Sequence, residues 1–346
     1  MKCGILTFYF AHNYGAVLQA VALRDYLIST GNEVEVIDFV PQKLQNEYSL
    51  NPFARSHNPK AVIKRFIHLP KRYKQYMLFQ KFINKEFMTK PRLGSYDIVF
   101  FGSDQIWNEK ITGEIYTYFG EGIADKIQKV AYAASFGSSN LSEFQKGCCK
   151  LYLPRFKNIA LRETDVIAAV SKLSDKEVVS VMDPVFLLNR GEWEVFASHS
   201  KNKDERYILY YVLRNDPQLI SETSKLEKKY GYRVICIHPT GNDLAVNWKQ
   251  LYNIGPYEFV DLIRKAEVVA TNSFHAMAFS VIFGKKAKYR AYSSTESRVP
   301  SLLSLCDAKR CLDSDGVYNF ELLDDARLIH EQKKSQSYIY NVLETV

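Results

Sequence analysis

Short apolar runs alternate along the chain with segments whose apolar positions recur every three or four residues. In the first half, the apolar runs cover residues 3–8, 34–38, 98–101, 130–134 and 159–161. These runs predict buried strands, and the periodicity of residues 16–28, ended by Gly31, predicts a helix after the first strand. Polar or glycine-containing loops follow three of the runs directly, at residues 102–108, 135–140 and 162–165. This pattern is typical of a parallel sheet whose strand ends lead into functional loops.

The alternation stops near residues 183–193, where Pro184 and Gly191 interrupt it, and then starts again. The second half has predicted strands at residues 207–213, 233–237, 268–271 and 287–292, and predicted helices at 218–230, 256–266, 275–283 and 298–305. A chain of 346 residues also exceeds what one hydrophobic core usually organises. We therefore expect an α/β protein with Rossmann-like domains at 1–182 and 183–321, and a C-terminal helix at 322–346 that packs back on the first domain.

Positive charge is concentrated in an insert at residues 42–92. Between Arg55 and Arg92 there are eleven Lys or Arg residues and one acid, Glu86, so this stretch carries +10 while the whole chain carries +8. Apolar residues are interleaved with these charges, which predicts one or two basic amphipathic helices. Such helices suit an anionic membrane surface, a phosphate-bearing glycan carrier or nucleic acid. The alternative is a solvated helical face in which lysine stems cover an apolar stripe.

The sequence carries no sign of export or of a membrane span. It becomes polar by His12, without the apolar region and cleavage site of a secretory signal. No run approaches the roughly 18 apolar residues that a transmembrane helix needs. The six cysteines form no C-x-x-C pair, so we expect reduced thiols rather than a metal site. These features predict a cytoplasmic protein.

Several well-known catalytic motifs are missing. The sequence has no Walker A motif, no H-E-x-x-H and no G-x-S-x-G. Gly120 and Gly122 supply only half of a dinucleotide fingerprint and do not follow a convincing strand. A nicotinamide-dependent enzyme is therefore disfavoured.

The segment T-N-S-F-H at residues 271–275 leaves a predicted buried strand and enters a helix at once. Asn272 or Ser273 can cap this helix, and the unpaired N–H groups of its first turn make an anion site. His275 would lie in that turn, where it can bind an anion or exchange a proton with a hydroxyl. A purely structural role in capping and packing is the alternative for this histidine.

Three further loops carry groups suited to binding. Arg162 directly follows an apolar run and offers a fork of donors to a carboxylate or phosphate, unless it pairs with Glu163 or Asp165. The loops at residues 11–16 and 102–108 combine glycine with polar and aromatic side chains. Tyr14 or Trp107 could stack on a sugar ring there, although turn formation and helix capping would explain the same residues.

In their order, six segments resemble the polysaccharide pyruvyl transferase family. They are N-Y-G-A at 13–16 with Gln19, G-S-D-Q-I-W-N at 102–108, A-S-F-G at 134–137, L-R-E at 161–163, D-P-V-F-L-L at 183–188 and T-N-S-F-H at 271–275. No single motif is unique to the family, but the six in this order are specific. The resemblance covers nearly the whole chain, apart from the basic insert and the C-terminal tail.

This resemblance implies a glycosyltransferase-B-like architecture, in which two Rossmann-like domains face each other across a cleft that binds phosphoenolpyruvate. Members of the family join pyruvate, as a ketal, to two hydroxyls of one sugar in an exopolysaccharide, a capsular polysaccharide or a lipid-linked precursor. Phosphoenolpyruvate is a co-substrate, and the chemistry requires neither a metal nor another cofactor. The implied partners are thus phosphoenolpyruvate and a glycan acceptor, with no nucleic acid. If the acceptor is lipid-linked, the basic insert would hold the enzyme on the inner face of the plasma membrane.

The resemblance also assigns roles by position. His275 resembles the general acid/base, and Arg162 resembles the clamp on the phosphate or carboxylate of the donor. Ser273, the backbone N–H of Phe274, and Arg298 complete the expected donor side. The expected acceptor side consists of Asn13, Tyr14, Gly15, Asp104, Gln105 and Trp107.

Two other functions remain open from the sequence. A glycosyltransferase of the same architecture would use a nucleotide sugar and would need a ribose pocket, for which Glu258 and Asp261 are conceivable but unspecific residues. A glycan-binding protein without catalytic activity is the second alternative, because a fold does not fix a function.

Overall fold

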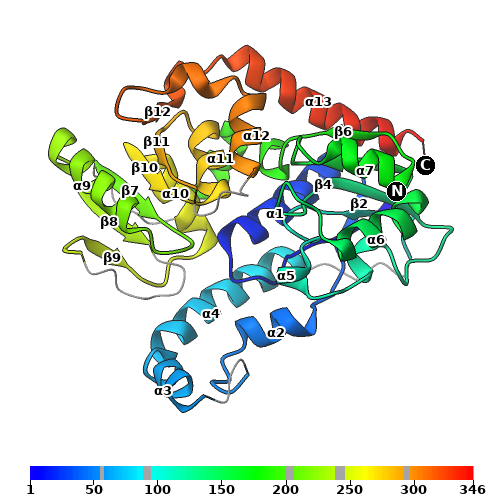
Figure 1. Cartoon of the computed structure of the whole chain (residues 1–346), viewed down its shortest axis with the longest axis horizontal. Helices are drawn as coiled ribbons and strands as arrows, with labels where there is room; N and C mark the ends of the chain where they lie inside the picture. The colour runs from blue at the N-terminus through cyan, green and yellow to red at the C-terminus, as the bar shows by residue number, and fades with distance from the viewer. Residues whose placement is uncertain (55–57, 89–94, 199–205, 238–245, 292–296, 346) are drawn as a thin grey trace.

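The computed structural model describes residues 1–54, 58–88, 95–198, 206–237, 246–291 and 297–345, and they form two α/β domains (Figure 1). Each domain is built on a six-stranded sheet. The first sheet has the strand order β2-β1-β3-β4-β5-β6, and all of its strands are parallel. Its strands are β1 (Lys2–Leu6), β2 (Glu33–Val36), β3 (Ile98–Phe101), β4 (Gln128–Ala134), β5 (Asn158–Leu161) and β6 (Val178–Ser180). Strand β3 is apolar throughout, and β1 and β4 are buried after their first residue, because helices cover both faces of a parallel sheet.

The second sheet has the order β12-β11-β10-β7-β8-β9, and only β12 is antiparallel to its neighbour. Its strands are β7 (Tyr207–Tyr211), β8 (Arg233–Ile237), β9 (Lys249–Leu251), β10 (Val268–Thr271), β11 (Lys286–Tyr289) and β12 (Tyr318–Asn319). The longer helices of this half are α8 (Arg190–Ala197), α9 (Pro217–Tyr230), α10 (Pro256–Lys265), α11 (Phe274–Ile282), α12 (Arg298–Leu305) and α13 (Asp325–Leu343). Short 3-10 turns are η4 (Pro184–Phe186), η5 (Ala308–Cys311) and η6 (Phe320–Leu322).

The helices of the first half divide into those that cover its sheet and those of the insert. The sheet is covered by α1 (Tyr14–Ser29), α6 (Glu143–Leu151) and α7 (Ile167–Ser174), whereas the short α5 (Glu109–Thr112) contacts α2 (Gln42–Tyr48) of the insert; 3-10 turns are η2 (Thr117–Phe119) and η3 (Leu153–Arg155). The insert also contains α3 (Pro59–Ile67), α4 (Leu69–Ile83) and a π-helical turn, η1 (Asn84–Met88). None of the described helices is long and apolar enough to cross a membrane.

The predicted α/β architecture is confirmed, and the apolar runs mark most of the strands. The run at residues 3–8 forms a strand only as far as Leu6, and the run at 207–213 ends as a strand at Tyr211. Three short strands, β6, β9 and β12, had no recognisable run because each spans only two or three residues. Residue 292, at the end of a predicted strand, lies outside the described residues, as do Arg55, Lys90 and Arg92 of the basic segment.

The C-terminal helix α13 lies against the first domain, so the chain ends on the domain where it began (Figure 1). The hydroxyl of Tyr338 donates to the carbonyl of Ala131 in β4 at 3.1 Å. The hydroxyl of Ser335 accepts the N–H of Met182 at 2.9 Å. The chain therefore passes between the domains twice, near residues 181–189 after β6 and again near the start of α13.

Helix α1 lies at the junction of the two domains. It is apolar around its whole circumference and buried from Tyr14 to Arg24. A helix of this kind must be covered on all sides, and α1 contacts β1 and β2 of its own domain and also α10, α11 and η4. The ring of Tyr14 stacks on Phe259 of α10 with centroids 4.3 Å apart, and its hydroxyl donates to the carbonyl of Ile254 at 2.9 Å. Tyr14 thus holds the domains together.

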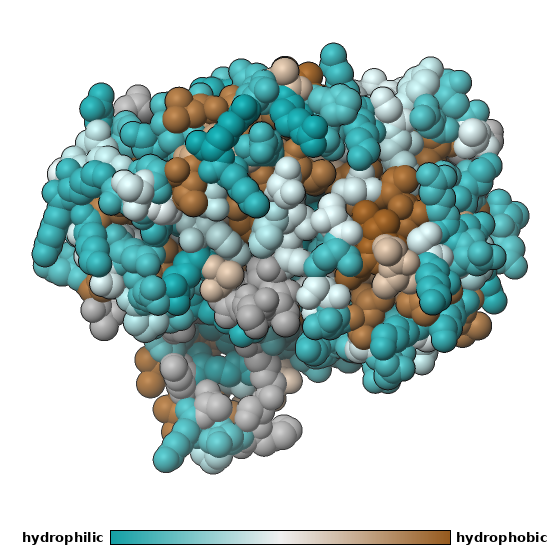
Figure 2. Space-filling model, turned by 45° about the horizontal axis from the view of Figure 1, so that its top comes forward, coloured by the Kyte–Doolittle hydropathy of each residue, from teal (hydrophilic) through white to brown (hydrophobic). Residues whose placement is uncertain are grey.

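The insert helices α2, α3 and α4 project from the first domain as a separate lobe (Figure 1). In Figure 2 this lobe extends from the bottom of the molecule and carries hydrophobic and hydrophilic surface side by side. Its large exposed apolar side chains are Phe53, Ile63, Phe66, Ile67, Tyr73 and Met77. Lys60, Lys74 and Lys81 are exposed on the same lobe. The prediction of basic amphipathic helices is confirmed for the described part of the insert.

Candidate active site

The carboxyl ends of strands from both sheets lead into one cluster of charged side chains. Arg162 follows β5 directly, and His275 follows β10 in the first turn of α11. Ser103 follows β3, and Asp183 follows β6 by three residues. Because parallel strands end at the same edge of a sheet, these residues meet where the two domains face each other. The cluster therefore joins the two sequence-predicted catalytic residues, which are 113 positions apart.

The loop that carries His275 is fixed by polar side chains. The hydroxyl of Thr271 donates to the carbonyl of Tyr211 at 2.6 Å and accepts the N–H of Ser273 at 3.0 Å. Asn272 accepts the N–H of Leu213 and donates to the carbonyl of Arg214. Ser273 is the N-cap of α11 and accepts the N–H of Ala276. The first-turn donors of α11, which have no partner within the helix, are thus held in one orientation.

The His275 ring lies against the backbone of Gly15 in the other domain. A Cβ atom added at Gly15 would come within 1.9 Å of His275 Nδ1, so no other residue type fits here without moving the ring. On its other side, His275 Nε2 lies 3.6 Å from Asp183 Oδ2 and has no hydrogen-bond partner. The ring is nearly buried, with 6% of His275 exposed. The absence of a side chain at Gly15 therefore allows the His275 ring to pack directly on the backbone there.

Arg162 is buried with part of its donor capacity unused. Its Nη1 donates to Asp183 Oδ2 at 2.5 Å, and its Nη2 lies 3.8 Å from Asp104 Oδ1. Neither Nε nor Nη2 has a hydrogen-bond partner. A buried donor without a partner costs about 1–3 kcal/mol. This cost would be relieved by an anion that accepts from the free edge of the guanidinium.

Two arginines from different domains flank the ring of Phe274. The guanidinium carbon of Arg162 lies 4.6 Å from the ring centroid, and that of Arg298, from α12, lies 6.0 Å from it. Both arginines are buried. The Phe274 ring also packs edge-on against His275, with centroids 5.1 Å apart. Cationic groups and the N-terminus of α11 thus surround the same position, which favours a negatively charged ligand.

Asp183 is a central residue of this site, although the sequence did not predict it as a site residue. It accepts hydrogen bonds from Ser103 Oγ at 3.0 Å and from the N–H of Val185 at 3.1 Å. Burial alone would raise its pKa, but the neighbouring His275 and Arg162 hold the pKa of Asp183 well below its usual range. Asp183 is therefore ionised and links the two catalytic candidates. Its signal in the sequence was the acidic residue that opens the D-P-V-F-L-L motif.

Glu163 was also not selected as a site residue, yet it lies directly behind Arg162. Its Oε1 accepts from Ser135 Oγ and from the N–H of Gly137, the latter at 3.0 Å, while its Oε2 has no hydrogen-bond partner. Burial raises the pKa of Glu163, and this effect outweighs the opposing attraction of Arg162. Arg162 is thus paired with Asp183, and the expected alternative pair with Glu163 does not form.

The expected acceptor residues differ in exposure: some are half-buried, and others are fully buried. Asn13 caps α1 by accepting the N–H of Gly15, and the half-buried Asp104 and Gln105 lie on the loop after β3. Trp107 is fully buried; it stacks on Phe119 and donates to the carbonyl of Tyr118. Tyr14 is buried as well, so neither ring is accessible to a sugar in this structure.

Asp261, one of the two acids considered for a ribose pocket, is occupied by basic neighbours. Asp261 is buried and pairs with Arg264 at 2.7 Å and with Lys265 at 3.5 Å, both on its own helix. These pairs neutralise the carboxylate within α10. Asp261 is thus a structural residue of that helix.

Comparison with solved structures defines the class of fold. The UDP-GlcNAc 2-epimerase of Methanocaldococcus jannaschii is similar over 100% of both chains, with 14% sequence identity and a TM-score of 0.52. The UDP-N-acetylglucosamine 2-epimerase of Rickettsia bellii is similar over 100% of this chain and 96% of its own, with 9% identity and a TM-score of 0.52. At such identities the likeness concerns the fold alone. The fold is glycosyltransferase-B-like, as the sequence predicted.

Sequence comparison then identifies the family. No curated protein matches the chain. The family model for polysaccharide pyruvyl transferase matches residues 13–294, which include every strand-end residue of the site described above. The chain belongs to the polysaccharide pyruvyl transferase family and is a transferase that acts on polysaccharide.

Proposed function

We propose that this protein transfers pyruvate from phosphoenolpyruvate to two hydroxyls of one sugar, in a surface polysaccharide or its lipid-linked precursor. The observation that carries the proposal is the buried Arg162, whose guanidinium lies over the ring of Phe274 and keeps two donor atoms without a hydrogen-bond partner. Phosphoenolpyruvate is small and carries both a phosphate and a carboxylate, so it suits a site lined by two arginines and a helix N-terminus. Arg162, Arg298, Ser273 and the backbone of Phe274 are the proposed donor-binding groups.

The proposed reaction begins with a proton added to the methylene carbon of phosphoenolpyruvate. This step makes the neighbouring carbon electrophilic, and a sugar hydroxyl forms a bond to it. The bond from that carbon to the phosphate oxygen then breaks, and the oxygen of a second hydroxyl takes its place and closes the ketal. The two sugar hydroxyls release two protons. One replaces the proton that was added to the methylene carbon, and the other goes to the departing phosphate. The products are the pyruvylated sugar and inorganic phosphate.

His275 is the proposed general acid and base for these proton transfers. An imidazolium formed during the reaction would lie 3.6 Å from the ionised Asp183, which stabilises it. Arg162 stabilises the negative charge that builds up on the departing phosphate. In this arrangement Asp183 is a positioning residue, because it orients Arg162 and His275 and does not reach the substrate itself.

This proposal predicts that phosphate is released from phosphoenolpyruvate only when an acceptor sugar is present. The assay would measure inorganic phosphate with a panel of galactose- and N-acetylhexosamine-containing acceptors. The melting temperature, measured in parallel, should rise with phosphoenolpyruvate because a ligand that binds only the folded state stabilises it. If UDP-N-acetylglucosamine raised the melting temperature and phosphoenolpyruvate did not, a nucleotide-sugar transferase would be the better interpretation. Binding of sugars without any turnover would favour a non-catalytic glycan-binding protein.

We further propose that the insert lobe binds an anionic membrane surface, as a lipid-linked acceptor would require. Ile63 and Ile67 on α3 are 59% and 71% exposed, and Phe66 lies next to them in sequence. Exposed lysines, including Lys60 and Lys74, accompany this apolar surface. Apolar insertion combined with attraction between lysines and anionic lipids is the usual basis of peripheral membrane binding.

Charge and apolar surface should contribute separately to this membrane binding. The variant Lys60→Glu/Lys74→Glu is expected to sediment less with vesicles containing phosphatidylglycerol, with the loss reduced at high salt because salt screens surface charge. The variant Ile63→Ser/Ile67→Ser should lose binding at both salt concentrations. Ile329→Ser is a matched control, since Ile329 is an exposed isoleucine of α13 on the main body. Equal sedimentation of all variants would rule out the lobe as a membrane anchor.

A further inference from the structure

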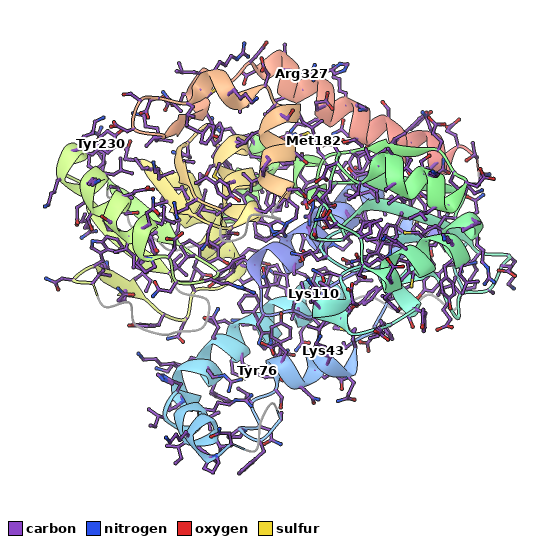
Figure 3. The ribbon with its side chains drawn as sticks, viewed as in Figure 1. Lys43, Tyr76, Lys110, Met182, Tyr230 and Arg327 are labelled. Carbon is purple, nitrogen blue, oxygen red and sulfur yellow. The ribbon has the colours of Figure 1, made fainter. Side chains whose placement is uncertain are left out.

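A cavity of about 460 Å³ lies where the insert meets the edge of the first sheet. Its walls come from the loop after β1, the chain after β2, and helices α2, α4 and η1. The wall formed by α2 is held by Lys43, whose Nζ donates to the carbonyl of Lys110 at the start of α5 at 2.6 Å (Figure 3). A volume of this size is within the usual range for small-molecule sites, which begins at about 300 Å³. The cavity is separate from the Arg162 and His275 cluster.

The lining combines aromatic rings with uncharged hydrogen-bonding groups. The rings of Tyr48 and Tyr76 are half-buried at its surface, and Tyr76 comes from the middle of α4 (Figure 3). The amides of Gln45, Gln80 and Asn84 line the same cavity. Aromatic faces match the apolar faces of a sugar ring, and amides donate to and accept from its hydroxyls. This set of groups suits a carbohydrate.

The charge of the lining disfavours phosphate and other anions. None of the described residues that line the cavity is Lys or Arg, and the only carboxylate is Asp38, which accepts a hydrogen bond from Tyr9. Burial, and to a smaller extent the nearby Arg72, lower the pKa of His12 to about 4. His12 is therefore uncharged at neutral pH. A neutral, hydroxyl-rich ligand fits this lining better than a nucleotide or the phosphate of a lipid carrier.

The cavity and the reaction site share one loop, but, within the described part of the chain, none of the residues that line the cavity belongs to the Arg162 and His275 cluster. His12 lines the cavity, and Gly15, three residues later, packs against the His275 ring. In the sheet, β1 is separated from β5, which precedes Arg162, by three strand spacings, or roughly 14 Å. That distance is greater than one sugar ring spans. A sugar in the cavity would therefore be a different unit of the chain from the sugar that reacts with a donor held by Arg162.

We propose that this cavity is a subsite for the acceptor glycan, which holds a neutral sugar removed by one or more units from the sugar that receives pyruvate. This inference rests on the proposed function, because only that function makes the bound sugar part of the acceptor. It gives the insert a role in choosing the acceptor, since α2, α4 and η1 form most of the cavity. It also makes acceptor length a determinant of affinity.

Direct binding of neutral saccharides tests the subsite without relying on catalysis. The probes are mono- to tetrasaccharides built from galactose and N-acetylhexosamine, and binding is followed by saturation-transfer difference NMR in the absence of phosphoenolpyruvate. We expect the longer probes to bind wild type and His275→Gln equally. The variant Gln45→Ala/Tyr48→Ala should bind them about tenfold more weakly. Tyr340→Ala is the matched control, because it removes a tyrosine that is 56% exposed on α13.

The outcomes separate the subsite from the reaction. In turnover assays, the Gln45→Ala/Tyr48→Ala variant should show a higher KM for the acceptor and an unchanged KM for phosphoenolpyruvate. The subsite is refuted if no probe binds, if this variant binds as tightly as wild type, or if inorganic pyrophosphate displaces the saccharide. Saccharide binding that depends on Gln45 and Tyr48, without any phosphate release from phosphoenolpyruvate, would instead refute the proposed reaction and leave the subsite standing.

Discussion

Replacing His275 with glutamine is expected to lower the rate of phosphate release by about 10³-fold, the usual contribution of a general acid or base. Glutamine keeps a hydrogen-bonding side chain of similar reach but cannot exchange a proton near neutral pH. The imidazole makes no hydrogen bond through Nε2, and Asp183 keeps its ion pair with Arg162 when His275 is replaced. The melting temperature should therefore stay within about 3 °C of wild type. Binding of phosphoenolpyruvate, measured by calorimetry, should persist.

The matched control for this variant is His330→Gln on α13. His330 is exposed and remote from the site, so its replacement should leave the rate unchanged. If His275→Gln retained more than a tenth of the wild-type rate, His275 would be a packing residue, and the proton donor would have to be sought elsewhere in the site. The buried Glu163, whose pKa is raised, would be the next residue to test.

Replacing Arg162 with alanine is expected to affect both stability and donor binding. The change leaves the ionised Asp183 buried without its closest charged partner, and breaking a buried ion pair in this way costs about 3–5 kcal/mol. The same change removes the unused donor atoms that we assign to the donor, so the KM for phosphoenolpyruvate should rise by at least about tenfold. Urea unfolding and steady-state kinetics measure the two effects.

A second variant separates these two effects. Arg162→Ala/Asp183→Asn removes the unpaired charge and should recover part of the lost stability without recovering affinity for phosphoenolpyruvate. Arg190→Ala is a suitable control, since the ion pair of Arg190 with Glu194 is exposed and should contribute less than about 1 kcal/mol. Recovery of phosphoenolpyruvate binding by the double variant would contradict a direct role for Arg162.

The stabilisation by Asp183 should also depend on pH in a defined direction. Because its pKa is lower in the folded protein than in the unfolded chain, its contribution is fully present above the unfolded value, about 4. The contribution is lost as the pH falls below that value toward the lower folded pKa. The difference in unfolding free energy between wild type and Asp183→Asn should accordingly shrink under acidic conditions and remain constant from about pH 5 to 8.

The strands of this fold were predictable because a parallel sheet buries both of its faces. Residues such as Ile98–Phe101 must then all be apolar, and such a run is visible without any structure. The short edge strand β12 pairs along only two residues, which leaves no pattern to detect. The residues at strand ends were predictable for the same reason as the strands. Arg162 and His275 could be selected because each follows a recognisable strand within a few positions.

Two residues, Asp183 and Trp107, could not be interpreted correctly from the sequence. The strand before Asp183 is too short to recognise, and the direction of the Trp107 ring is not encoded in a local pattern. Asp183 follows β6, which is three residues long, so no apolar run marked it as a strand-end residue. Trp107 follows a loop in which the sequence does not reveal whether the ring turns inward or outward. In the structure its indole fills the space between Phe119 and Phe136, where burial of a large aromatic surface is favourable. A sequence shows which groups are near a strand end but not which way they turn.

The double passage of the chain between the domains has a mechanical consequence. Two connections, near residues 181–189 and at the start of α13, define a line about which one domain could rotate relative to the other. Asp183 lies on one of these connections, whereas His275 is carried by the opposite domain and rests on Gly15. Rotation would lift the imidazole off Gly15 while Arg162 and Asp183 stay together. The proposed acid/base would then be in place only while the two domains are in contact.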